Sequence, residues 1–218
     1  MIKKSIISKS ELFIRSISFS NFTILKDKFS LISSKISYNE LKFTIKTFCI
    51  ILLILSMIIH VPNKNTLIID EFKFKCCIGK KGLNSNKKEG DCTTPIGLFR
   101  LKKLYFRKDR VGTPECKIAK KIIKRDMAWC DDPNHKKYNQ EIKVNNKNLK
   151  ENLYRKDHKY DYIISISHNE KKVPGKGSAV FIHLTDDYTP TAGCIALKRK
   201  DFEIFLKLIN EKTKIKIG

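Results

Sequence analysis

The chain has 218 residues, of which 41% are hydrophobic and 31% are charged, so it is long enough and apolar enough to form a packed core. Six Pro and nine Gly exclude collagen-like and linker-dominated chains. The formal net charge of +23 suits an acidic polymer or an anionic lipid. The basic residues are spread along the chain without an arginine-rich tract or an aromatic RNA-binding signature, so we expect no nucleic acid partner.

The N-terminal part of the sequence has the features of an export signal. Residues 47–63 contain no Asp, Glu, Lys or Arg, and this run lies at the short edge of the ~17–25 residues that a helix needs to cross a bilayer. Nine basic and three acidic residues precede it in residues 1–46, which favours a cytoplasmic N-terminus. We predict a basic leader over 1–42 and an uncleaved apolar anchor helix over 43–63. The protein would then cross the inner membrane once, with the following domain in the periplasm.

Two alternatives to this topology remain open. The apolar run is also compatible with a buried core helix, or with a start site placed too far upstream. In either case the domain would stay in the cytoplasm.

From about Thr66 the sequence changes to short apolar runs, rich in β-branched and aromatic residues and separated by Gly, Pro, Asn and Asp. Apolar residues from Phe202 to Ile209 recur at i, i+3, i+4 and i+7, which predicts a helix near the C-terminus. A weaker helix is predicted over 116–124. The pattern therefore predicts a mainly β (α+β) domain over 66–218 with a short C-terminal helix. The predicted strands are residues 67–70, 72–78, 96–104, 162–167, 178–184 and 214–217.

Cys194 has a different setting from the other cysteines, because it follows Gly193 and a short loop separates it from His183, near the end of a predicted strand. A histidine beside a thiol supplies the base that makes it nucleophilic and lowers its pKa. A preceding glycine lets backbone N–H groups face a substrate. Taken alone, the pair is a weak signal, because a core histidine and an inert cysteine would give the same pattern. The remaining cysteines are Cys49, Cys76, Cys77, Cys92, Cys116 and Cys130; none has CxxC or CxxH spacing, so we expect no metal and no other cofactor.

Two separated motifs carry a family resemblance. Residues 178–197 read SAVFIHLTDDYTPTAGCIAL, and residues 89–99 read EGDCTTPIGLF. In this order they resemble the L,D-transpeptidase catalytic domain (the YkuD-type family), whose signature is a His on a strand, a loop, and then Ser/Thr-His-Gly-Cys. The resemblance covers roughly residues 66–218 and implies a β-sandwich or barrel fold.

The resemblance assigns roles to the residues that match these motifs. It implies that Cys194 is the nucleophile and that His183 is the proton donor and acceptor, oriented by a backbone carbonyl near Leu184. The backbone at Gly193 would help to hold the oxyanion. Asp186 and Asp187, in the loop between the pair, are an alternative means of orienting His183. The implied substrate-binding residues are Thr94, Pro95 and Gly97. Trp129 is a further candidate for lining a substrate groove, and packing inside the domain is the alternative for it.

This sequence departs from the family pattern at two positions. The His that usually lies two residues before the nucleophile is Ala192, and the Arg often found two residues after it is Ala196. The first change leaves the proposed base in place. The second removes a cation that would hold the substrate or the shape of the site.

The implied activity is cysteine-dependent acyl transfer on peptidoglycan stem peptides in cell-wall biogenesis, without a metal or an organic cofactor. An L,D-carboxypeptidase or amidase would use the same pair with water as the acceptor. A catalytically degenerate domain that binds the cell wall is a third reading. Nothing in the sequence separates an amine acceptor from water.

Overall fold

The first strand of the domain begins earlier than the sequence predicts. β1 (Ile58–Asn63) occupies the end of the expected anchor. Its Ile59 and Val61 are fully buried in the core of the domain, while Ile58 is half exposed. This alternation is typical of a strand with one buried face, so residues 58–63 form part of the domain's main sheet in the structure.

The computed structural model describes residues 57–144 and 151–218. The leader predicted over 1–42 and the part of the anchor before Met57 lie outside the described residues. None of the helices in the described ranges combines the length and the apolar composition needed to cross a membrane.

In the described part of the chain, nine strands form the main sheet, in the order β13-β12-β11-β6-β14-β1-β2-β3, with β7 beside β6. All six strands predicted from the sequence overlap strands of this sheet, which confirms the mainly β prediction. The remaining bounds are β2 (Thr66–Ile69), β3 (Phe72–Lys75), β6 (Gly97–Phe106), β7 (Lys120–Ile122), β11 (Tyr162–Ile166), β12 (Phe181–Leu184), β13 (Ile195–Leu197) and β14 (Lys214–Ile217).

The segment after β3 nearly closes this sheet into a barrel. Cys77 pairs with Ala196 of β13, at the opposite edge, and both backbone hydrogen bonds of this bridge are made, at 2.9 and 2.8 Å. A second bridge joins Gly79 to Thr191. Closure removes exposed strand edges, and it agrees with the sandwich or barrel expected from the sequence.

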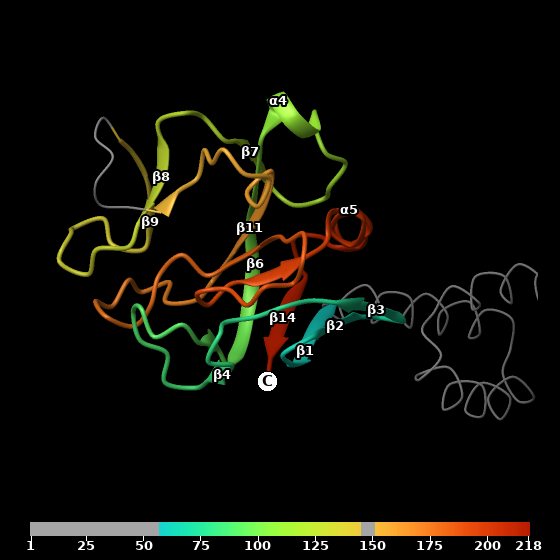
Figure 1. The fold of residues 1–218 in the computed structure, drawn as a ribbon, viewed down its shortest axis with the longest axis horizontal. Helices are drawn as coiled ribbons and strands as arrows, with labels where there is room; N and C mark the ends of the chain where they lie inside the picture. The colour runs from blue at the N-terminus through green and yellow to red at the C-terminus, as the bar shows by residue number, and fades with distance from the viewer. Residues whose placement is uncertain (1–56, 145–150) are drawn as a thin grey trace, which may run out of the picture. The chain divides into compact units, whose positions relative to one another are not determined.

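Two small sheets lie outside the barrel. One has the order β10-β8-β9, and the other pairs β4 with β5. In Figure 1, β8 and β9 lie on one side of the long strand β6, and β1 to β3 lie on the other. Their bounds are β4 (Leu83–Asn84), β5 (Thr94–Pro95), β8 (Met127–Cys130), β9 (Gln140–Lys143) and β10 (Glu151–Asn152).

The helix predicted near the C-terminus is present as α5 (Arg199–Leu208). Its buried residues include Phe202 and Phe205, as the apolar spacing predicts, and Phe202 stacks on Tyr162 with ring centroids 5.5 Å apart. Burying each such aromatic side chain stabilises the domain by about 1.5–3 kcal/mol. The described residues contain one other short helix, α4 (Lys108–Val111).

The helix predicted over 116–124 is wrong. Residues 120–122 form β7, which pairs in parallel with residues 104–106 of β6. Ile118 and Ile123 are buried on either side of it. The run is rich in β-branched residues, and hydrogen bonding to a neighbouring strand outweighs its weak helical spacing.

The two faces of the barrel wall pack different groups of side chains. The inner face and α5 enclose the larger hydrophobic core. On the outer face, Tyr105, Ile163 and Phe181 come from β6, β11 and β12 and pack under the β10-β8-β9 sheet. The functional candidates lie on this outer face.

Candidate active site

Paired strands carry His183 and Cys194 to the same face of the barrel. The parallel pairing of β12 with β13 aligns Ile182 with Ile195, so Cys194 lies level with Phe181, two residues before His183. Alternate residues of a strand share a face, and Cys194 packs against the cluster that contains Phe181. Diagonal neighbours of this kind have Cβ atoms about 7–8 Å apart. The structure therefore brings the predicted pair together.

His183 is held in one tautomer by the backbone. Its Nδ1 lies 2.8 Å from the carbonyl oxygen of Leu184, so Nδ1 carries a proton and donates it, while Nε2 is left as the acceptor. Burial first of all, together with the nearby charges of Arg155 and Lys159, lowers the pKa of His183 to about 4. The Leu184 carbonyl is the orienting group expected from the sequence. Asp187 instead accepts from Thr189.

Cys194 is held by two backbone contacts. Its Sγ donates to the carbonyl oxygen of Ala179 at 3.2 Å and accepts from the Phe181 N–H at 3.3 Å. Burial raises the pKa of the Cys194 thiol to about 12, although the Phe181 N–H acts in the opposite direction. The sequence predicts a thiol acidified by its histidine. The structure differs, because removal from water disfavours the thiolate more than its surroundings favour it.

Within the described ranges, His183 and Cys194 do not share a hydrogen bond. The thiol proton points to Ala179, and the imidazole is neutral at pH 7 because its pKa is about 4. The thiol and the imidazole are therefore both neutral in the structure, and we call them the resting pair. Proton transfer requires the thiol to rotate from the Ala179 carbonyl toward Nε2.

Gly193 lies where another residue would clash. Its φ is +147°, and a Cβ placed there would be 2.8 Å from the carbonyl oxygen of Thr93. Thr94, whose side chain is completely buried, donates from Oγ1 to the Gly193 carbonyl at 2.9 Å and accepts from the Gly79 N–H at 2.9 Å. The Gly193 N–H donates to Oγ1 of Thr191 at 3.0 Å. The two sequence motifs are therefore packed directly against each other.

Lys87 is a site residue that the sequence did not single out. It is buried, its Nζ lies 2.6 Å from Oδ1 of Asp91, and it would be 3.3 Å from a Cβ at Gly193. Asp91 in turn accepts from the N–H and Oγ1 of Thr93, at 2.9 and 2.7 Å. Lys87 therefore brings a positive charge close to Gly193 and Cys194. The only sequence signal for it is its place just before the EGDCTTP motif.

Trp129 is connected to Cys194 through Asn139, a second residue that the sequence did not single out. Oδ1 of Asn139 accepts from Nε1 of Trp129 at 2.9 Å and from the Ala179 N–H at 3.2 Å. Ala179 has a φ of +49°, a left-handed conformation that costs a non-glycine residue free energy, and its carbonyl is the one that binds Cys194. The Asn139 side chain thus holds the backbone that orients the thiol.

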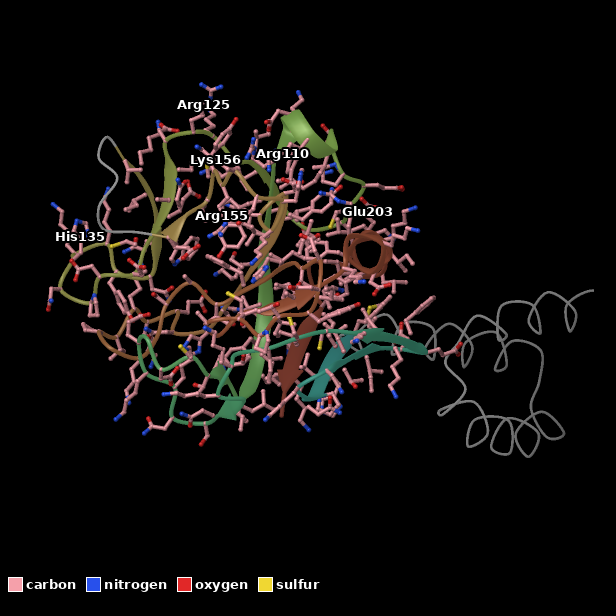
Figure 2. The ribbon with its side chains drawn as sticks, in the orientation of Figure 1. Arg110, Arg125, His135, Arg155, Lys156 and Glu203 are labelled. Atoms are coloured by element: carbon pink, nitrogen blue, oxygen red, sulfur yellow. The ribbon has the colours of Figure 1, made fainter. Side chains whose placement is uncertain are left out.

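A polar and aromatic wall borders the pair on the side of β10. The ring of Tyr160 lies 5.3 Å from the His183 ring, and the guanidinium of Arg155 lies 4.9 Å from the Tyr160 ring. Arg155 also pairs with Glu151 at 3.4 Å. The negative charge of Glu151 contributes to the raised pKa of Cys194. Figure 2 labels Arg155, beside Lys156, in the upper part of the domain.

The other predicted residues lie at different distances from the pair. Pro95 is buried in β5, directly after Thr94. Gly97 pairs with Ile217 at the start of β6, the end of that strand remote from Tyr105, so the structure does not bring it to the site. Cys92 is half-buried, with its thiol on the carbonyl of Gly90. All six cysteines in the described ranges are unpaired.

The two departures from the family pattern have different settings. Ala192 is exposed, whereas Ala196 is completely buried and pairs with His183 on one side and Cys77 on the other. No group of three or more His, Cys, Asp or Glu side chains in the described residues is arranged to hold a metal ion.

Comparison with known proteins identifies the fold family. A sequence profile of the L,D-transpeptidase catalytic domain (YkuD) matches residues 57–217. Similar solved structures include Bd1075 from Bdellovibrio bacteriovorus (12% identity, TM-score 0.40, 74% of this chain) and the helical cell shape determining protein Pgp2 from Campylobacter jejuni (17% identity, TM-score 0.42, 75% of this chain). This chain covers 47% of each of these two chains, about half their length. A search of curated proteins found no match.

Proposed function

The chain belongs to the L,D-transpeptidase catalytic domain (YkuD) family, and from this premise we propose that it is a cysteine-dependent acyl transferase acting on peptidoglycan stem peptides. The observation that supports the proposal most directly is the setting of His183. Its Nδ1 is bound to the Leu184 carbonyl, so a neutral Nε2 remains for proton exchange on the face that carries Cys194.

The proposed reaction begins with proton transfer. His183 takes the thiol proton at Nε2 as the sulfur of Cys194 attacks the carbonyl carbon of a diamino-acid residue that precedes a terminal D-amino acid. The Gly193 N–H is engaged by Thr191, so we assign the Cys194 N–H to the oxyanion. His183 then protonates the leaving amine, and the C–N bond breaks to give a thioester. A second stem-peptide amine attacks this thioester and releases the thiol.

A mass spectrum after incubation with a disaccharide-tetrapeptide tests this proposal. Cross-linked dimers support an amine acceptor, and trimmed tripeptides indicate an L,D-carboxypeptidase that uses water at the same site. Both products must disappear in Cys194→Ala and persist in Cys92→Ala. The absence of any product from the unmodified protein would contradict the enzymatic proposal and favour a wall-binding domain.

We further propose that the chain is attached to the inner membrane by the apolar residues before Met57, with the domain in the periplasm. The basic leader over 1–42 and the apolar residues 43–56 that follow it support this topology, whereas residues 58–63, the end of the predicted anchor, form β1. A reporter fused after Gly218 should behave as exported. Reporter activity in the cytoplasm would contradict the topology without affecting the chemistry proposed for Cys194.

A further inference from the structure

A cavity of about 480 Å³ lies on the outer face of the barrel, beside the proposed nucleophile. Its floor comes from β6, β11 and β12, and its walls come from the β8–β9 hairpin and residues 167–172. Neither Cys194 nor His183 lines it. Nothing in the proposed chemistry uses this space.

Strand register relates the cavity to the thiol. Lys103 pairs with Ser165, Ser165 pairs with Phe181, and Cys194 lies level with Phe181 on the next strand. With strands about 4.8 Å apart, Lys103 is three strands, or roughly 14 Å, from Cys194 along one row of the sheet. An extended peptide rises about 3.3 Å per residue, so the row spans about four residues. Phe181 and Trp129, with ring centroids 5.2 Å apart, line the cavity, and both pack in the cluster that contains Cys194.

The acidic side chains that line the cavity are paired with basic residues, whereas two of its lysines have no ion-pair partner in the described part of the chain. Among the cavity-lining acids, Glu170 is paired with Lys102 and also with Arg100, and Glu141 is paired with Lys121 at 2.5 Å. Lys103 and Lys172 also line the cavity, and neither has an ion-pair partner among the described residues.

His168 adds no charge to this cavity. It is half-buried at the cavity wall, and its Nε2 lies 2.9 Å from the carbonyl of Lys176. Burial lowers the pKa of His168, so the ring is neutral at pH 7. The free charge in the cavity is therefore that of the two unpaired lysines.

We propose that this cavity binds the carboxylates of the acyl-donor stem peptide, with Lys103 and Lys172 as the groups that receive them. This inference rests on the proposed function and adds a specificity site to it. Stem peptides carry free carboxylates, and the length of the row matches a peptide of about four residues whose scissile bond lies at Cys194. Lys103 is half-exposed and Lys172 is exposed. Solvent therefore weakens the charge-assisted hydrogen bond that each would donate to a carboxylate.

Peptide binding to Cys194→Ala protein tests the cavity without requiring any reaction. The probe is a disaccharide-tetrapeptide with free carboxylates, titrated calorimetrically, and its fully amidated counterpart. We expect Lys103→Gln and Lys172→Gln each to raise Kd about 2- to 5-fold, and full amidation to raise it by about as much as both substitutions together. The double variant should no longer distinguish the two peptides. Lys207→Gln, an exposed lysine on α5, is the charge-matched control and should leave Kd unchanged.

Two results would overturn the inference: equal binding of both peptides by protein with both lysines, or a double variant that binds like Lys207→Gln. Circular dichroism melting of each variant shows whether it is folded. Acylation of the intact thiol by a small carbapenem is measured in parallel, because that reagent does not reach the cavity. Normal acylation with unchanged peptide binding would refute the cavity alone. Absent acylation with lysine-dependent binding would refute the proposed chemistry and leave the cavity assignment standing.

Discussion

The Cys194 thiol should react slowly with a small alkylating reagent at neutral pH. Its pKa is raised from 9.0 to about 12, so the thiolate fraction at pH 7 falls from about 10⁻² to about 10⁻⁵. A more basic thiolate is also more nucleophilic, with a Brønsted coefficient of about 0.4–0.5, which recovers roughly 15- to 30-fold. We therefore expect iodoacetamide to label Cys194 about 30- to 60-fold more slowly in the folded protein than in the same chain unfolded in urea.

The assay is mass-spectrometric quantification of the Cys194 peptide over pH 6 to 10. The labelling rate should rise about tenfold per pH unit across this whole range, because the thiol is still far below its pKa. His183→Gln should leave that slope unchanged, since the resting pair shares no proton. A plateau below pH 7 that disappears in His183→Gln would reveal a thiolate–imidazolium pair and refute the reasoning from burial.

Three further outcomes follow from the same contacts. The free energy of unfolding should fall by about 3 kcal/mol as pH drops from 6.5 to 4, because the unfolded chain protonates His183 near 6.5 and the folded chain only near 4. Urea unfolding at a series of pH values measures this fall, and His183→Gln should abolish the part of it that His183 causes. Thr94→Val should cost about 1–3 kcal/mol for each of the two backbone groups it leaves unpaired, whereas Thr94→Ser should retain most of the stability, and equal losses in urea unfolding would contradict this. Asn139→Ala should release the Ala179 carbonyl, so that labelling of Cys194 speeds up at pH 8 while carbapenem acylation slows; parallel changes in both rates would indicate general loosening instead.

Local sequence patterns were sufficient for the parts of the fold that depend on neighbouring residues. The apolar spacing from Phe202 to Ile209 identified α5 because a helix buries one face at that period. The β-branched runs identified strands of the main sheet. The same rule failed at 116–124, where pairing of residues 120–122 with β6 decides the structure and the partner lies outside the local window.

The candidate site could be predicted from the sequence only in part, for the same physical reason. His183 and Cys194 lie close together in the sequence, and one strand pairing brings them to one face. Asn139 and Glu151 come from segments far away in the chain, and they affect the thiol through the Ala179 backbone and through charge, respectively. An isolated Asn or Glu in a polar stretch has no distinctive pattern. Their roles come from strand register and long-range packing, which single-sequence periodicity does not contain.

Ala196 stands where the family often has an arginine, and the positive charge near Cys194 comes from a different residue. The cation expected two residues after Cys194 is absent, and Ala196 in its place is completely buried and pairs through its backbone with Cys77. Lys87 instead places a charge beside Gly193 and favours the thiolate of Cys194. Arg155, on the other side, disfavours the imidazolium of His183. Lys87 therefore favours transfer of the proton from sulfur to imidazole, and Arg155 disfavours it. We infer that the resting pair stays neutral until a substrate carbonyl can accept the developing negative charge, so thiol reactivity is tied to occupancy of the site.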